Sequence, residues 1–385
     1  MEKKVTMQKD ETKGISVVIP SFGRVGYLRD LLEALKVSIE QFPFPSEVII
    51  VDSTPAPDDT SVRALARDFG CLYLHAPNAV SLKRNVGFRH ARYTAILYLD
   101  SDCTPTPDIL IEHWKCLNSS KDVGGCLGLV IFEGKEHWFW DVIELTPYIL
   151  PFQWPLYDKE VPWGPTANIS FWKHILSRVN GFDETFPPWP GGEDVDLGLR
   201  ITESGYHILT NPHAKVFHTR ETWLGWRKMA RRLYRWGQAD YHLYLRHPNR
   251  VFLQFPRDTI VWIGVSIEVI MLSLLKQNIL LMLFVPVFIV NTLFLQAWFQ
   301  HLRFGSKKKN SSVMKQLASI VLSLFDEAGF VLLAIKNIDS IALLYKMKYT
   351  AGQQIGEWHY GSIRVWSMIL SLIITTAIFL LCGIL

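Results

Sequence analysis

Two aspartates separated by one residue, Asp100 and Asp102, directly follow a short apolar run at 95–99. Alternating carboxylates at the end of a strand can hold a hard divalent cation, Mg²⁺ or Mn²⁺, through oxygen. A cation in that place could bind the diphosphate of a substrate and neutralise charge as the diphosphate leaves. Because acidic turns are common, the pattern by itself is weak evidence for a metal site.

A second acidic pair, Glu193 and Asp194, follows two glycines, Gly191 and Gly192. The glycines allow the backbone to come close to a ligand, and a positioned carboxylate can take the proton of an attacking hydroxyl group. The alternative is structural, because acids in the first turn of a helix over 194–204 are stabilised by its dipole. That alternative does not explain the glycines. We expect Asp194 to be the base and Glu193 to support it or to bind the acceptor.

The elements that must position these acids come from residues 15–220, where short apolar runs alternate with helical patterns. This alternation predicts an α/β domain with a mostly parallel, Rossmann-like sheet. The expected strands are 15–19, 47–51, 71–74 and 95–99, and the expected helices include 27–38 and 60–69. Ligands of such sheets bind beyond the carboxyl ends of the strands. Residues 20–24, 52–53, 76–78 and 100–102 follow those ends and are expected to form one site.

Six motifs in this order extend the pattern: VVIPSFGR, VIIVDS, SLKRNVG, YLDSD, WGPTAN with NGFDETF, and GGEDVDLGLR. Together they resemble the family 2 glycosyltransferases, which have a GT-A fold. The resemblance covers residues 15–220, a little over half of the chain. It implies a metal-dependent enzyme that transfers a sugar from a nucleotide donor with inversion at the anomeric carbon.

The resemblance also implies roles for single residues in donor binding. Those expected to contact the nucleotide or the sugar are Pro20, Ser21, Arg24, Asp52, Lys83, Arg84, Asp100 and Trp163. Asp52 would accept hydrogen bonds from the base, and Lys83 and Arg84 would lie near the base and the phosphates. The family often has DDGS where this chain has Asp52-Ser53-Thr54, and Asn-x-Gly where it has Asn78-Ala79-Val80. The base is therefore open, with a UDP-sugar as the default donor.

Three residues are expected to form the Mg²⁺ or Mn²⁺ site: Asp102, Asp100 and His218. His218 matches a histidine that completes the metal site in related enzymes, and a neutral imidazole favours Mn²⁺ over Mg²⁺. Without the resemblance, a single histidine after a strand is more often structural. Trp163 and Trp189 flank the motifs, and their rings could stack on a sugar.

The last third of the chain predicts an α-helical membrane region at 259–385. Residues 279–298 and 365–385 have no charge and the length of a bilayer span; 259–275 is shorter and forms a tight hairpin with the span that follows. The run 313–335 has Asp326 and Glu327 in its middle, where ionised acids are costly, and lysines on both sides. We expect it to be re-entrant or interfacial, with a fourth span as the alternative.

Residues 221–258 are strongly basic and contain an amphipathic helix, in which Trp226, Met229, Leu233 and neighbouring apolar residues form one face. A basic amphipathic helix beside a span is expected to lie in the cytoplasmic headgroup layer and to bind anionic lipids. The alternative is a surface helix packed on the soluble domain. The Arg235-Trp236 pair resembles part of the QxxRW motif of processive synthases, but Arg232 stands in place of the glutamine.

Composition narrows the function further. The chain is 49% hydrophobic, which excludes disorder, and its five cysteines form neither a disulfide framework nor a CxxC zinc pair. No apolar leader opens the sequence, so the first part is expected in the cytosol. The net charge of +4 divides into an acidic body and a basic remainder; the basic residues indicate a membrane surface rather than nucleic acid. Oligomeric state is not predictable.

Four functions remain, in order of preference. The first is transfer of one sugar to a hydroxyl of a lipid-linked glycan or glycolipid by an integral membrane protein whose catalytic domain faces the cytoplasm. The second is glycosylation of a polyprenyl phosphate, which is already ionised and needs no base. The third is processive polysaccharide synthesis, and the fourth is a membrane adaptor with an inactive fold. The intact acids argue against the fourth.

Overall fold

The computed structural model describes residues 12–253, 257–305, 311–350 and 355–384, with side chains left out for 355–361. Contacts divide the described chain into two units. The first holds the residues up to Gly134 together with Leu150–Thr219, and the second holds Lys135–Ile149 together with everything after Thr219. The segment 135–149, which the sequence analysis places inside the domain 15–220, therefore packs with the membrane region.

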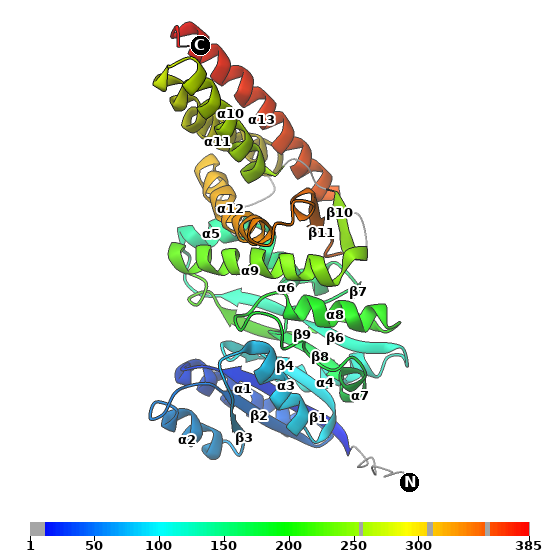
Figure 1. Ribbon diagram of the computed structural model, residues 1–385. Coiled ribbons are helices and arrows are strands. Elements are labelled where there is room, and N and C mark those ends of the chain that lie inside the picture. Colours follow the sequence, from blue (N-terminus) through cyan, green and yellow to red (C-terminus); the bar gives the residue numbers. More distant parts are fainter. Residues whose placement is uncertain (1–11, 254–256, 306–310, 351–354, 385) are drawn as a thin grey trace. The chain divides into compact units, whose positions relative to one another are not determined.

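The first unit begins with a parallel sheet in the order β3-β2-β1-β4 (Figure 1). Its strands are β1 (Thr12–Ser21), β2 (Ser46–Asp52), β3 (Leu72–His75) and β4 (Tyr93–Leu99). The connecting helices are α1 (Val25–Gln41), α2 (Thr60–Asp68) and α3 (Val80–His90). The strands at 15–19, 47–51 and 95–99 form as predicted because both faces of each run are buried.

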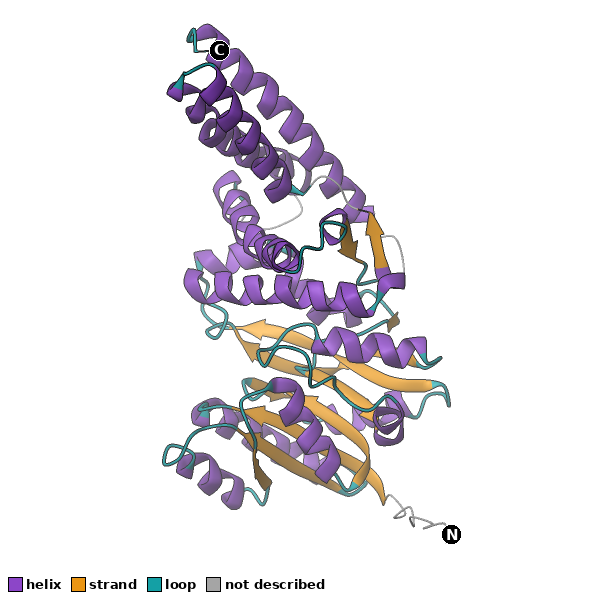
Figure 2. Ribbon diagram, in the orientation of Figure 1, coloured by secondary structure: helices purple, strands orange, loops and turns teal. Residues whose placement is uncertain are grey.

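The sheet continues from β4 through β8, β6, β9 and β5, with β7 paired to β9 (Figure 2). These strands are β5 (Cys103–Pro105), β6 (Val123–Glu133), β7 (Glu160–Val161), β8 (Asn168–Trp172) and β9 (His207–Thr219). The helices of this half are α4 (Ile109–Leu117), α6 (Leu150–Gln153), α7 (Lys173–Arg178) and α8 (Glu193–Glu203). Strand β8 runs antiparallel to both β4 and β6, so this half of the sheet is mixed.

A buried polar network ties this half together. The His113 ring on α4 contacts Asn168 Oδ1 at 2.8 Å and Ser170 Oγ at 2.9 Å, both on β8. Asn168 donates in turn to the carbonyls of Leu129 on β6 and Ala214 on β9. Three strands and one helix thus meet at two fully buried side chains.

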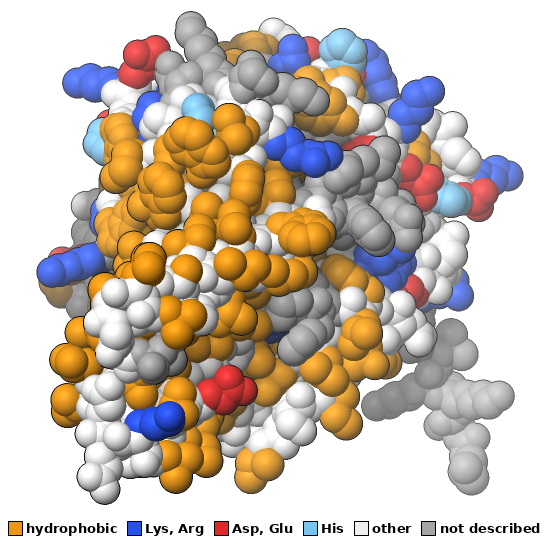
Figure 3. Space-filling model, turned by 90° about the horizontal axis from the view of Figure 1, so that it is seen from above, with side chains coloured by type: hydrophobic (Ala, Val, Ile, Leu, Met, Phe, Trp, Pro, Cys, Tyr) orange, Lys and Arg blue, Asp and Glu red, His pale blue; other side chains and the backbone are white. Residues whose placement is uncertain are grey.

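The second unit is helical. It contains α5 (Trp138–Glu144), α9 (Trp226–Arg246), α10 (Asp258–Leu275), α11 (Phe284–Phe304), α12 (Val313–Lys336), α13 (Ile355–Leu381) and a two-stranded antiparallel sheet of β10 (Val251–Leu253) with β11 (Tyr345–Met347). Within the described residues, four helical segments are long and apolar enough to cross a membrane: Asp258–Leu275, Ile279–Phe304, Val313–Lys336 and Ser362–Leu381. Seen from above these helices, apolar side chains cover much of the surface (Figure 3). Large exposed ones include Ile267, Leu275, Val290, Phe294 and Leu380.

The two acids that made 313–335 doubtful as a span, Asp326 and Glu327, lie in α12, and both have partners on other segments of the second unit. Glu327 accepts hydrogen bonds from the amide and hydroxyl of Thr259, and it forms an ion pair with Arg364 at 3.0 Å. Asp326 accepts a hydrogen bond from Tyr148. Acids with such partners can stay in apolar surroundings. The two acids are therefore compatible with a fourth span at 313–335.

Helix α9 packs on α12 backbone to backbone. A Cβ atom added at Gly237 would lie 1.8 Å from the carbonyl oxygen of Asp326, and one at Gly329 would lie 2.0 Å from that of Tyr234. Around this crossing Tyr241 meets Phe330, with ring centres 5.8 Å apart. The apolar face of α9 is therefore covered by protein. The sequence analysis expected this face to lie among lipid headgroups, whereas in the structure it lies against α12. Arg227, Lys228 and Arg231 are exposed.

Candidate functional site

The carboxyl ends of β1 and β2 form the first wall of the site. Ser21 and Asp52 are register partners there. The Asp52 carboxylate accepts hydrogen bonds from the Thr54 amide (3.1 Å), the Thr54 hydroxyl (2.9 Å) and the Tyr73 hydroxyl (3.4 Å). The Thr54 hydroxyl also accepts the Gly23 amide at 2.8 Å. Two turns far apart in sequence are thus held together, and Pro20 reaches the same edge.

Helix α3 supplies a buried lysine to this wall. Lys83 Nζ donates to the Ser21 carbonyl at 3.0 Å and to Asn78 Oδ1 at 3.2 Å. Burial, reinforced by the neighbouring Arg84, lowers the pKa of Lys83 to about 8. The hydroxyls of Ser21, Ser53 and Ser81 are buried with no hydrogen-bond partner among the described residues. Unsatisfied hydroxyls beside a buried cation fit a polar, anionic ligand.

Arg84 connects the carboxyl end of β4 to the second acidic pair. Its Nη1 atom lies 2.6 Å from Glu193 Oε1, and its Nη2 atom lies 3.6 Å from Asp100 Oδ1. Arg84 and Glu193 are both almost fully buried. One guanidinium therefore fixes two of the predicted site residues, which come from β4 and α8.

The glycine turn before α8 aims Asp194. Gly191 and Gly192 have φ of 136° and 86°, values that favour glycine, and the Gly191 amide donates to Glu193 Oε2 at 2.6 Å. Asp194 Oδ1 accepts only a local bond from the Val195 amide, at 2.9 Å. Burial and the Glu193 carboxylate raise the pKa of Asp194 to about 7, against the opposing effect of Arg84. A carboxyl with that pKa can accept a proton near neutral pH.

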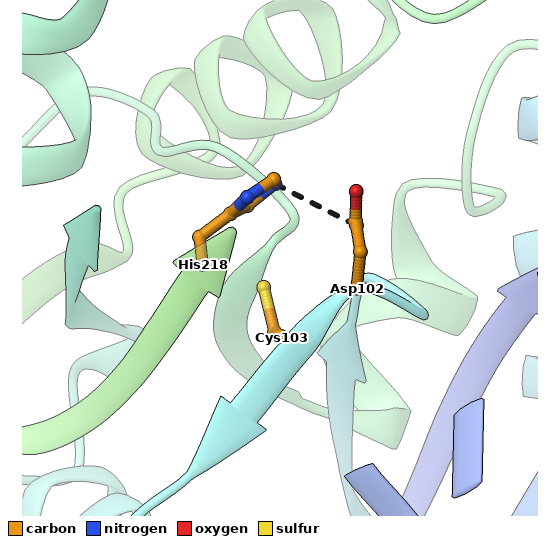
Figure 4. A group of neighbouring side chains, drawn as sticks. All are labelled: Asp102, Cys103 and His218. Atoms are coloured by element: carbon orange, nitrogen blue, oxygen red, sulfur yellow. Dashed lines mark ion pairs between the residues drawn. The ribbon is translucent and has the colours of Figure 1, made fainter. Parts of the chain in front are cut away.

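A second group of side chains comes together at Asp102 (Figure 4). His218 Nε2 lies 3.6 Å from Asp102 Oδ1, and the Cys103 thiol completes a group whose donor atoms all lie within 4.8 Å of one another. Arg24 Nη1 contacts the other oxygen, Asp102 Oδ2, at 2.6 Å. Asp102 Oδ1 and His218 Nε2 are an oxygen and a nitrogen donor close enough to ligate one divalent metal, while Arg24 holds the other carboxylate oxygen. Asp100, expected in the metal site, pairs with Arg84 and is not among the three residues of this group.

Trp163 lies in the core of the first unit. Its ring centre is 5.0 Å from that of Trp154 in an edge-on contact. A Cβ atom at Gly198 of α8 would lie 2.4 Å from Trp163 Cβ. Trp163 therefore packs directly beneath the helix that carries the acidic pair.

Sequence reasoning missed Cys103, Thr54 and Tyr73. Thr54 and Tyr73 hold Asp52; Thr54 was quoted only as a departure from the family pattern, and Tyr73 lies outside the quoted motifs. Cys103 follows Asp102 directly, but a single cysteine has no spacing by which to recognise it. The signal that could have found it is its cross-strand pairing with His218 on β9.

Comparison with known proteins places this site in context. Residues 16–176 match the family model of glycosyl transferase family 2, and residues 160–222 match a model described as the N-terminal domain of galactosyltransferase. The pre-mycofactocin glycosyltransferase of Mycobacterium tuberculosis is 28% identical over 252 residues, which cover 62% of this chain and 49% of that protein. The chondroitin synthase of Escherichia coli is 24% identical over 242 residues, 53% of this chain and 34% of that protein. The chain thus spans about half of these relatives or less.

Two solved structures match the chain with TM-scores below 0.5. The mannosyltransferase PcManGT from Pyrobaculum calidifontis, in complex with GDP-Man and Mn²⁺, matches with a TM-score of 0.46 and 14% identity, over 93% of this chain and 86% of that one. TarS of S. aureus matches with a TM-score of 0.41 and 15% identity, over 60% of this chain and 43% of that one.

Proposed function

We propose that this chain, whose residues 16–176 match the family model of glycosyl transferase family 2, moves one sugar from a nucleotide-sugar donor to a hydroxyl of a lipid-linked glycan or glycolipid. The transfer inverts the anomeric carbon and takes place at the cytoplasmic face of a membrane. A UDP-sugar remains the default donor.

The observation that carries this proposal is the state of Asp194. Its raised pKa and its position after two glycines suit a base that removes the proton of an acceptor hydroxyl as the new bond forms. Glu193 cannot share that task while it is paired with Arg84. It therefore serves to position Asp194 and the Arg84 guanidinium.

We assign donor binding to the residues at the carboxyl ends of β1, β2 and β4 and on α3. Asp52 and the free hydroxyls of Ser21 and Ser53 suit the base and ribose, and Lys83, Arg84 and Arg24 suit the diphosphate. Asp102 and His218 would hold Mg²⁺ or Mn²⁺, with Asp100 turned to the donor sugar or ribose. When bound there, the ion supplies positive charge for the departing diphosphate.

A hydroxyl acceptor is favoured over a phosphate acceptor by the same carboxyl. A lipid phosphate is already ionised, so a base with a pKa near neutrality would have no proton to remove. The four apolar helices support an acceptor that resides in a membrane.

The test uses the full chain in nanodiscs. Thermal shift is measured against UDP-, GDP- and dTDP-sugars with Mg²⁺ or Mn²⁺, and the shift by the true donor should disappear in Asp102→Asn. With that donor and a hydroxyl-terminated glycolipid, Asp194→Asn should keep the shift and lose transfer by a factor on the order of 10² or more. Transfer by Asp194→Asn at the wild-type rate would contradict the assigned base.

The same assay separates the alternative functions. If polyprenyl phosphate is the only acceptor used, and Asp194→Asn uses it as fast as the wild type does, the second function replaces the first. Products that grow beyond one sugar without release would indicate a processive synthase.

A further inference from the structure

The Cys103 thiol lies among the residues assigned to the metal. Cys103 begins β5 and pairs across the sheet with His218 on β9, so its backbone position is fixed by that pairing. In Figure 4 its sulfur points to the same side as the Asp102 carboxylate and the His218 ring. All three donor atoms lie within 4.8 Å of one another, and all three residues are buried.

This group offers a metal one oxygen, one nitrogen and one sulfur. Mg²⁺ takes oxygen ligands and binds sulfur poorly, whereas Zn²⁺, Co²⁺ and Cd²⁺ bind imidazole and thiolate well. A site with carboxylate and imidazole alone would discriminate far less between these ions. The donor set therefore carries information about which ion is preferred.

We propose that Cys103 is the third protein ligand of this site and makes it prefer a thiophilic divalent ion over Mg²⁺. The inference rests on the metal site of the proposed function. On binding, the metal–sulfur bond forms and the thiol proton leaves to solvent, so one proton is released for each ion bound and no redox step is involved. The Arg24 guanidinium gives up its contact with Asp102 Oδ2 or shares that oxygen with the ion.

Cobalt is the direct probe. The full chain is titrated with Co²⁺ in a Cys382→Ser background, because Cys382 is exposed and could bind the ion on its own. We expect a near-ultraviolet sulfur-to-cobalt charge-transfer band. The band should vanish in Cys103→Ser and persist in Cys71→Ser, the matched cysteine control. Competition with Mg²⁺ should show at least a tenfold loss of Co²⁺ preference in Cys103→Ser.

A second measurement covers the case in which Cys103→Ser does not fold. Cadmium NMR of the chain with only Cys382 replaced reports a sulfur ligand through a strong downfield shift of the ¹¹³Cd resonance. A cadmium shift in the oxygen and nitrogen range, or a cobalt band that survives in Cys103→Ser, would overturn the proposal.

These readouts do not depend on sugar transfer. If Asp194→Asn shows the cobalt band and the wild type transfers no sugar to any hydroxyl, the proposed function fails while the sulfur ligand stands. If transfer proceeds and the band is absent, the reverse holds.

Discussion

Among the described residues, Asp194 forms no ion pair, in contrast to Glu193 and Asp102, which each pair with an arginine. Glu193 is bound to Arg84 and Asp102 to Arg24, with 2.6 Å contacts in both cases. Burial beside the Glu193 carboxylate favours the protonated form of Asp194. Two neighbouring acids in one turn are thereby given different properties.

The first prediction concerns the pH dependence of transfer. Because the pKa of Asp194 is raised to about 7, its basic form increases from pH 5.5 to pH 8. We expect kcat/KM for a hydroxyl acceptor to rise over that range with a midpoint near the pKa. Initial rates at saturating donor measure it, and a profile already flat at pH 5.5 would exclude this role.

The second prediction concerns His113 and stability. Burial lowers the pKa of His113 to about 4, against an ordinary value of 6.5. The folded state therefore excludes a proton that the unfolded state accepts. Its contribution to stability is complete above pH 6.5 and declines as the pH falls toward 4, by at most about 3 kcal/mol.

Thermal melts of the full chain at pH 7.5 and pH 5 test this prediction. The Tm of the wild type should fall more between the two values than that of His113→Gln, which cannot take up the proton. His90→Gln, at an exposed position, is the control and should behave as the wild type does. Equal drops in all three proteins would mean that the network of His113 with Asn168 is not sensitive to pH.

At the scale of the elements, the contact between α9 and α12 leaves no room for larger side chains at its two glycines. Both helices place a glycine where the carbonyl of the other passes, so a methyl group at either position meets backbone that cannot move aside. Such contacts join helices more closely than larger side chains allow.

The third prediction follows from this crossing. Gly237→Ala should lower the Tm of the full chain, because overpacking of about 1–3 kcal/mol exceeds the helix propensity gained. Gly264→Ala on α10 is the matched control, since a Cβ atom there meets nothing within 4 Å. Its Tm should stay the same or rise; an equal drop in both variants would show that the crossing is not the cause.

The sequence predicted elements better than it predicted their partners. Strands such as 95–99 are apolar on both faces, and the helix at 226–235 has a regular periodicity, so local pattern is enough for both. The pairing of α9 with α12 joins segments about ninety residues apart, and no local pattern encodes it. The site shows the same limit, because Asp102 stands in a motif whereas Cys103 gains its meaning only from the β5–β9 pairing.

For the whole molecule, the basic residues left exposed on α9 are the point of contact expected with a membrane. Arg232 is not one of them, since its guanidinium lies 4.3 Å from the centre of the Trp223 ring. Arg227, Lys228 and Arg231 are exposed. Each basic residue near an anionic surface contributes about 1 kcal/mol, and salt screens the attraction.

The fourth prediction is that replacing Arg227, Lys228 and Arg231 by glutamine removes the stimulation of transfer by anionic lipid. Activity is measured in nanodiscs with and without phosphatidylglycerol, at low and high salt. Replacement of Arg29, Lys36 and Arg67, exposed on α1 and α2, is the control and should keep the stimulation. Stimulation that survives in the α9 variant would remove the role proposed for anionic lipids.

The α9–α12 crossing also has a consequence for biosynthesis. Helix α9 leaves the ribosome well before α12 exists, so during that interval its apolar face has nothing to cover it. The helix reaches its final state only after α10 and α11 have been made, and those are the helices that bring the chain to the bilayer. A chain stopped after residue 258 would thus expose the apolar face of α9 and aggregate, so membrane insertion of the later helices is a step in completing the packing of α9 as well as in anchoring the protein.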